Sequence, residues 1–446
     1  MVFKNCLIAL PDSDDFVNAD IREENGIIVE IGKNLNGKEG IDLKNLLVFP
    51  GGIDAHTHFN EPGFEEREEF LTGSMGGISS GITMVIDMPC TSIPPVTNIQ
   101  NLLTKLKKIE GKSYVDYGLF GGVSGNSFDE FEENMRGLKD YVSGFKTYFL
   151  SGMETFNELD HFQFENVLRI AKEIKKPVLL HAEDPLYVRS ATEKFKKLGD
   201  KPLYYYFSRP EIAEIISVQN ACRINEKIGA ELHFVHISSS ESVDIISKYD
   251  NVTCETGPHY LEFSSEELER FGPILKTAPV VKSSENRERL MEKFIKGEIF
   301  YIASDHAPAP SSEKIGKNIW EAYSGIPGIE TLYIYTLSEF LFKKKIGLKD
   351  FLKLTSENPA KRFNIFKRKG SIEIGKDCDL VVVNPDGETV VKGERFFSKG
   401  KLTPFEGMRF KGVIEMTILR GNIAFKNPDY FSKPSGIFIK PEVKNG

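Results

Sequence analysis

Cysteine is scarce in this sequence, and the cysteines that occur are not paired by spacing. Only five of the 446 residues are cysteines, none of them in a Cys-x-x-Cys motif: Cys6, Cys90, Cys222, Cys254 and Cys378. An odd, scattered set argues against a disulfide framework and against a cysteine-based zinc site. It is typical of a protein of the reducing cytoplasm, which is the location we expect.

Long apolar runs and an excess of positive charge are also missing. No stretch approaches the roughly 20 apolar residues of a membrane helix. The short apolar run at residues 1–10 has neither a basic segment before it nor a small-residue cleavage site, so we expect a strand there rather than a signal peptide. With a net charge of -8, the chain offers no basic surface for nucleic acid or an anionic membrane. The expected partner is therefore a small-molecule substrate.

The order of strand and helix patterns predicts a (β/α)8 barrel of the TIM type. Residues 50–365 alternate short apolar runs with helix-period segments, and the eight strand candidates are 53–59, 82–88, 117–120, 144–149, 177–181, 231–236, 252–255 and 300–305. Eight strands alternating with helices over this length are typical of that barrel.

Both ends of the chain have a different texture. Residues 1–49 and 366–446 contain strand patterns separated by glycine, asparagine and aspartate turns. We expect the two end segments to form one small β-sandwich domain beside the barrel of residues 50–365.

Two histidines stand two residues apart at the end of the first barrel strand. His56 and His58 follow the turn signal Pro50-Gly51-Gly52. Residues i and i+2 of a strand point to the same face, so both imidazoles can reach one divalent metal ion. An ordinary alternative is a pair of histidines held by hydrogen bonds near a turn, and this pair alone does not decide between the two.

The other ionisable residues at strand ends favour the metal site. His181, His236 and Asp305 each end a predicted strand, and Lys146 lies inside the apolar strand 144–149. In a barrel of this type the carboxyl ends of the strands meet at one face, where the chemistry is done. Singly, each residue has an ordinary role, as a hydrogen-bonded histidine or a helix cap, but all of these would have to hold together. By strand parity, His233 is expected to point away from His236.

Lys146 also needs a chemical explanation. A charged, unpaired lysine in an apolar strand costs several kcal/mol. Carbon dioxide adds to a neutral amine and forms a carboxylate, which can bridge two cations. We therefore expect Lys146 to be neutral or carboxylated.

Together these motifs resemble the cyclic amidohydrolases: dihydroorotases, allantoinases, hydantoinases and dihydropyrimidinases. The resemblance runs along most of the chain and rests on His56-Thr57-His58, Gly144-Phe145-Lys146, His181-Ala182-Glu183, His236-Ile237-Ser238, Ser304-Asp305-His306 and Gly375-Lys376-Asp377-Cys378-Asp379-Leu380. It implies two divalent cations, zinc by expectation, bridged by N6-carboxylated Lys146. The more buried cation would be held by His56, His58, Lys146 and Asp305, and the second by Lys146, His181 and His236.

The same resemblance implies the reaction. A hydroxide between the two cations would attack the ring amide, with Asp305 as the catalytic base that passes its proton to the leaving nitrogen. Relatives of this kind form dimers or tetramers, so a homo-oligomer is expected. A non-catalytic structural relative is the remote alternative, although such relatives lose metal ligands that this chain keeps.

Two positions favour an allantoinase, which hydrolyses allantoin to allantoate. Dihydroorotases usually have an arginine where this chain has Asn60, and an asparagine where it has Cys90; both bind the substrate carboxylate. Their absence suits a ring with a neutral ureido group. Asn60 and Cys90 are therefore candidate substrate contacts, as are Gly325 and Gly328 in a loop whose backbone touches the ring in the family.

Other readings of the substrate remain open. A dihydroorotase in which Arg67 or Arg209 replaces the missing arginine is one, and a hydantoinase or dihydropyrimidinase is another. Glu255 and His259, in Glu-Thr-Gly-Pro-His, suit either a support for the metal ligands or ordinary turn bonding.

Overall fold

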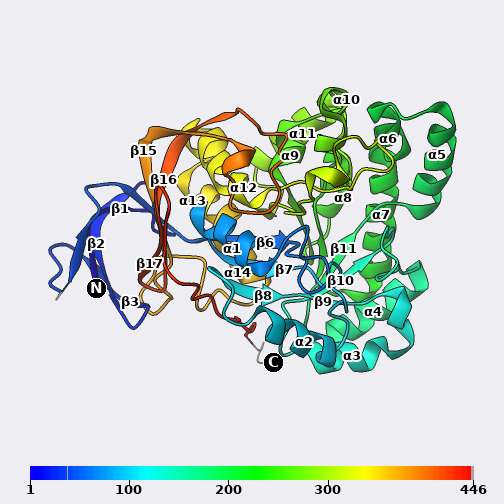
Figure 1. Cartoon of the computed structure of the whole chain (residues 1–446). Coiled ribbons are helices and arrows are strands. Elements are labelled where there is room, and N and C mark those ends of the chain that lie inside the picture. The colour runs from blue at the N-terminus through cyan, green and yellow to red at the C-terminus, as the bar shows by residue number, and fades with distance from the viewer. Residues whose placement is uncertain (38, 443–446) are drawn as a thin grey trace.

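The computed structural model describes residues 1–37 and 39–442, and its larger part is a barrel of strands surrounded by helices (Figure 1). The barrel strands are β6 (Gly52–Thr57), β7 (Ile82–Asp87), β8 (Asp116–Leu119), β9 (Gly121–Gly122), β10 (Phe145–Tyr148), β11 (Val178–His181), β12 (Leu232–Phe234), β13 (Val252–Thr256) and β14 (Tyr301–Ile302). Their pairings are all parallel, in the orders β6-β7-β8 and β9-β10-β11-β12-β13-β14. Only Phe120 separates β8 from β9, and a parallel bridge from Thr57 to His306 closes the ring. The predicted barrel of eight parallel strands is therefore confirmed.

Helices connect and cover these strands. They are α1 (Phe70–Ser79), α2 (Ile99–Ile109), α3 (Phe131–Leu138), α4 (His161–Glu173), α5 (Pro185–Leu198), α6 (Pro202–Ser208), α7 (Glu211–Ile228), α8 (Ser240–Ile246), α9 (Pro258–Glu262), α10 (Ser265–Phe271), α11 (Ser284–Ile295), α12 (Ile329–Thr336), α13 (Leu348–Leu352) and α14 (Asn358–Arg362). Helix α4 shows how the local sequence specifies a helix. Asp160 and Gln163 form a capping box at its start, and its apolar side chains face the core. Within the described ranges, no helix is long and apolar enough to cross a membrane.

The two ends of the chain build one sheet beside the barrel, at the left of Figure 1. Its strands are β1 (Val2–Ile8), β2 (Val17–Glu24), β3 (Ile27–Gly32), β4 (Gly40–Asp42), β5 (Leu47–Pro50), β15 (Leu380–Val390), β16 (Arg409–Leu419), β17 (Asn422–Lys426) and β18 (Tyr430–Phe431). The order is β18-β17-β16-β15-β5-β1-β2-β3, with β4 beside β1. The N-terminal and C-terminal halves meet where β5 pairs antiparallel with β15.

Strands β5 and β15 are buried on both faces. Val48 and Val382 point into a core shared with β1, β2, β3 and β16, whereas Phe49 and Val381 point into the large core of the barrel. This alternation follows from the two-residue period of a strand, and it fixes the sheet on the barrel. The terminal sheet domain predicted from the sequence is thus one continuous sheet folded over its own core. The domain boundaries predicted at residues 49 and 365 remain predictions.

Two barrel strands are only half their predicted length or less. The expected strands 231–236 and 300–305 are ordered as strands only over β12 and β14. His236 and Asp305 have φ values of 42° and 48°, in the left-handed region. Such a residue ends a strand and turns its side chain out of the strand's alternation.

Candidate active site

The six predicted ligands gather at the carboxyl ends of the barrel strands. His56 lies in β6 and His58 follows it, Lys146 lies in β10, and His181 ends β11. His236 and Asp305 stand shortly after β12 and β14. A cavity of about 300 Å³ opens here, and five of the six residues line it; Lys146 is fully buried and is not a lining residue. The sequence prediction that these distant residues meet at one face agrees with this arrangement.

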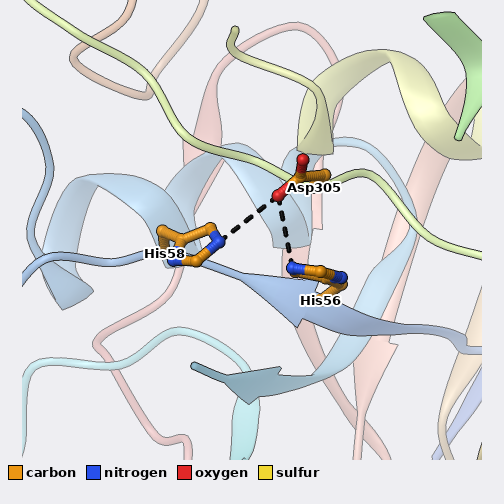
Figure 2. A group of neighbouring side chains, drawn as sticks. All are labelled: His56, His58 and Asp305. Carbon is orange, nitrogen blue, oxygen red and sulfur yellow. Dashed lines mark ion pairs between the residues drawn. The ribbon is translucent and has the colours of Figure 1, made fainter. Parts of the chain in front are cut away.

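His56, His58 and Asp305 form the tightest group (Figure 2). Oδ1 of Asp305 lies 3.3 Å from Nε2 of His56 and 3.3 Å from Nε2 of His58. Burial alone would raise the pKa of Asp305, but the neighbouring charges of His56 and His58 lower it to about 2. Their ligand atoms all lie within 4.8 Å of one another, and a set of two imidazoles and a carboxylate suits a divalent cation.

Lys146 is a buried amine without a partner. Its side chain is fully buried, and among the described residues no hydrogen-bond acceptor meets its Nζ, which lies 4.8 Å from the centre of the Tyr148 ring. Burial lowers the pKa of Lys146 to about 8. An orphaned amine at this position fits a carboxylated lysine, because the added group would supply the missing oxygen atoms.

His181 and His236 form a second pair beside it. Nδ1 of His181 lies 3.1 Å from Nε2 of His236, and Nδ1 of His236 is buried with no hydrogen-bond partner in residues 1–37 and 39–442. Burial is the main reason that the pKa of both histidines is lowered. Neutral imidazoles are the form in which histidine binds metal ions. The donor set thus fits a second cation.

Glu183 and Arg209 orient His181. Nε2 of His181 lies 2.9 Å from Oε2 of Glu183, and Arg209 donates to the same oxygen. Burial would raise the pKa of Glu183, but the charge of Arg209 lowers it to about 2. The His-Ala-Glu motif contained Glu183, but its contact with Arg209 depends on the fold and was missed.

Glu255 contacts the rings of His56 and His233 and orients both. Its Oε1 contacts Nδ1 of His56, and its Oε2 lies 3.2 Å from Nε2 of His233 and accepts a hydrogen bond from Tyr301. Burial would raise the pKa of Glu255, but the charge of His56 and the contact with His233 hold it well below its usual value. This position matches the role of support for a metal ligand.

The prediction that His233 points away from the site was wrong. His233 contacts Glu255, and the backbone N–H of His236 also faces that carboxylate, at 3.4 Å. The parity rule fails because the strand ends at Phe234 and His236 adopts a positive φ.

His259 is also buried, with its Nε2 unpartnered within the described chain, and burial lowers its pKa to about 4.

The predicted substrate contacts divide into two groups. Cys90 and Gly325 line the cavity, and Sγ of Cys90 lies 3.0 Å from the Tyr148 hydroxyl. Asn60 and Gly328 are not among the lining residues. The amide of Asn60 is buried with no hydrogen-bond partner in the described ranges, and the N–H of Gly328 donates to His306. Contact of Asn60 or Gly328 with a substrate remains a prediction.

Several lining residues were missed by sequence reasoning. Arg67, Arg209 and Cys90 had been named, but not the aromatic, apolar and polar side chains that complete the wall: Phe64, Tyr148, Leu150, Met153, Tyr323 and Ser324. Most stand on loops, where no periodic pattern marks which side chains face inward.

Comparison with known proteins relates the chain to one family. The sequence profile described as the amidohydrolase family matches residues 47–424. An allantoinase of Rubrobacter xylanophilus is 34% identical over 441 residues, covering 96% of this chain and 95% of that protein. An allantoinase of Salmonella gallinarum is 32% identical, covering 98% of each. Among solved structures, the L-hydantoinase (dihydropyrimidinase) from Arthrobacter aurescens has a TM-score of 0.93 and 27% identity over 99% of both chains.

Proposed function

This chain belongs to the amidohydrolase family, and from that premise we propose that it opens the ring of a cyclic amide by hydrolysis, with allantoin as substrate and allantoate as product. The observation that carries the proposal is the convergence of His56, His58 and Asp305 at the carboxyl ends of the barrel strands, together with a buried Lys146 whose amine has no hydrogen-bond partner among the described residues. In a protein with no ligand at this site, burying these polar side chains would cost free energy of folding without any compensation.

The proposed metal ligands are the six residues that converge at the carboxyl ends of the strands, and two of them, Lys146 and His236, each have a buried nitrogen with no hydrogen-bond partner among the described residues. We propose that His56, His58, Lys146 and Asp305 hold one divalent cation and that Lys146, His181 and His236 hold the other, with zinc in both and Lys146 carboxylated. When bound, such cations act as Lewis acids that polarise a carbonyl and make water acidic.

The chain's own residues account for proton transfer and positioning. The printed ion pairs of Asp305 with His56 and His58 both involve Oδ1, and we assign to Oδ2 the transfer of a proton from the attacking water to the leaving ring nitrogen. Leu150, Met153 and Phe64 give part of the cavity wall an apolar surface.

Allantoin is favoured by the replaced positions and by the relatives. By the resemblance, Asn60 and Cys90 replace the arginine and the asparagine with which dihydroorotases bind a carboxylate, and the relatives at 32–34% identity over nearly the whole chain are named allantoinases. The likeness to hydantoinases favours a hydantoin as the second candidate substrate. Self-association and a cytoplasmic location are proposed on the family resemblance and the cysteine pattern alone.

The test is steady-state hydrolysis of allantoin, hydantoin and dihydroorotate by the metal-replete protein in bicarbonate, with bound metal measured on the same sample. We expect kcat/KM for allantoin to exceed both others by at least about tenfold, the size of one lost polar contact. Faster turnover of dihydroorotate would reject the substrate assignment but keep the reaction class. Turnover of none of the three would reject the proposed function.

A further inference from the structure

Arg67 is a cavity arginine with donors to spare. It stands on the loop between β6 and α1, and its side chain is 25% exposed and lines the cavity together with the histidines. Its Nε donates to Glu313, at 3.0 Å from Oε2. In the part of the chain that the structure describes, neither terminal guanidinium nitrogen makes a hydrogen bond. Arg67 therefore presents two N–H-bearing nitrogens that a ligand can use.

The orientation of this guanidinium is restrained by aromatic rings. Its carbon lies 4.4 Å from the centre of the Tyr323 ring and 5.2 Å from that of Phe64, and both rings line the cavity. Contacts of this kind with aromatic rings restrain the plane of a guanidinium, whereas the ammonium group of a lysine has no plane to restrain. Since the backbone N–H of Tyr323 also donates to the carbonyl of Glu313, the two partners of Arg67 are fixed to each other.

The loop that carries Glu313 and Tyr323 is fastened to the barrel by two buried lysines. Lys314 donates to the carbonyl of Pro273, and Lys276 donates to the carbonyls of Trp320 and Ala322. Arg67 consequently meets a preformed partner surface rather than an unattached loop. A fixed donor is the kind of group that discriminates between ligands.

The other arginine of the cavity is already committed. Arg209 donates to Glu183, which in turn holds His181. Using it for a substrate would disturb a neighbour of the candidate metal ligands. Arg67 has no such duty, which singles it out among the lining cations.

Charge decides which substituent Arg67 suits. Glu313 cancels the charge of Arg67 but leaves its terminal N–H donors available. Glu313 does not line the cavity, but through its pairing with Arg67 its negative charge would repel a carboxylate on the ring, whereas the carbonyl oxygen of a ureido group accepts hydrogen bonds without that repulsion.

We infer that Arg67 is the specificity-determining residue of this site: its guanidinium binds the carbonyl of an uncharged ureido substituent on the ring, and Glu313 disfavours an anionic one. The inference rests on the proposed ring opening and extends it by assigning the substituent to a place in the cavity.

The test compares three substrates that share the hydantoin ring. They are hydantoin itself, allantoin, which carries a neutral ureido group, and hydantoin-5-acetate, which carries a carboxylate. For R67L we expect the ratio of kcat/KM for allantoin over hydantoin to fall about 10- to 100-fold, the usual cost of losing hydrogen bonds from a charged donor. R67K should recover part of that loss. E313Q should raise the ratio of hydantoin-5-acetate over allantoin by about tenfold, since it removes the repelling charge.

The matched control is the variant R136L. It removes an arginine of α3 that pairs with Glu132 and Glu173 outside the cavity, and the substrate ratios of this variant should equal those of the wild type. A parallel loss of allantoin and hydantoin turnover in R67L would mean that Arg67 only supports the loop, and would overturn the inference while ring opening stands. Unchanged ratios in E313Q would remove the role assigned to Glu313. A wild-type protein that opens none of the rings would reject the proposed function, and this inference with it.

Discussion

Lys146 differs from the other buried lysines in what surrounds its amine. Lys105 pairs with Asp87 at 2.7 Å, Lys276 donates to two carbonyls, and Lys369 touches three carboxylates. Among the buried lysines of the described ranges, Lys146 alone has an amine with no partner. The barrel core therefore carries a polar atom whose cost is offset only if something else binds there.

Carboxylation of Lys146 leads to a direct prediction. Protein incubated with ¹³C-bicarbonate and divalent metal should give one carbamate carbon signal by NMR, and K146M should abolish it. In K146M we expect metal content to fall and kcat/KM to drop by at least about 100-fold, since even changes in the residues that support metal ligands cost 10- to 100-fold.

The matched control is K276M. Burial also lowers the pKa of Lys276, to about 7, but its amine already has acceptors, so it should stay unmodified and the signal should persist in K276M. A signal that survives in K146M, or that is lost in K276M, would contradict the assignment.

At the scale of single residues, sequence reasoning located donors better than their surroundings. His56, His58 and Lys146 could be found because a histidine pair at strand spacing and a lysine in an apolar strand are unusual locally. Tyr323 could not, because its approach to Arg67 joins loops about 250 positions apart in the sequence. His233 was misplaced because strand parity was extended beyond the end of the strand.

Helix α12 carries a buried acid at its start. Glu330 accepts hydrogen bonds from the backbone N–H of Phe397 and the hydroxyl of Ser398, which holds the segment after β15 against the barrel. Burial raises the pKa of Glu330 from 4.5 to about 7, although Ser398 and Phe397 act in the opposite direction. The native state therefore binds a proton there more tightly than the unfolded chain does.

This linkage predicts how stability changes with pH. The stabilisation of the folded state by the protonated Glu330 carboxyl is fully present below pH 4.5 and is lost as the pH rises through about 7. The total is up to roughly 3 kcal/mol, at about 1.4 kcal/mol per unit of pKa shift. In E330Q the neutral amide removes this dependence, so the variant should gain stability relative to the wild type between pH 5 and pH 8 in urea unfolding.

The control is E288Q, which changes a glutamate of α11 that is 72% exposed. Its stability relative to the wild type should not vary over the same range. A constant difference between E330Q and the wild type at both pH values would show that Glu330 is already charged when folded.

At the scale of elements, the strands could be predicted but not their ends. The apolar runs marked all eight barrel positions, because a strand buried on both faces reads as continuous apolar sequence. Where β12 and β14 stop depends on the left-handed backbone of His236 and Asp305, which neither histidine nor aspartate announces in a sequence.

A buried charge cluster joins the terminal sheet to the barrel. Nζ of Lys369 lies 2.6 Å from Asp116 at the start of β8, 2.8 Å from Asp377 and 2.6 Å from Asp379. The three aspartates could by their spacing hold a metal ion, but the lysine already serves as their counter-ion. Arg420, between β16 and β17, also binds Asp116.

Removing Lys369 should lower the free energy of unfolding of the whole molecule. K369M leaves three buried carboxylates short of one positive charge, and breaking a buried pair in this way costs about 3–5 kcal/mol. The loss should appear in urea unfolding. R409A, which breaks the exposed pair with Glu388 on the same sheet, should have little effect. Equal stability of K369M and R409A would contradict the role of the cluster.

For the whole molecule, the sequence indicated the barrel and a domain shared by both ends. It did not indicate how the two ends pair, because register between β5 and β15 is set by partners far apart along the chain. The contact of Lys369 with Asp116 lies outside local pattern for the same reason.

The shared sheet also has a consequence for the order of events during synthesis. Strand β5 ends at Pro50 and its partner β15 begins at Leu380, so the edge of β5 is made long before the strand that covers it. At a usual elongation rate of 5–20 residues per second, the interval is roughly 15 to 65 seconds. For that time the apolar edge Leu47-Val48-Phe49 stays uncovered beside a barrel that is still growing. Early pairing of β5 with β1 covers only its other edge, so the edge that β15 will cover remains open to pairing with other chains until the C-terminal strands are made.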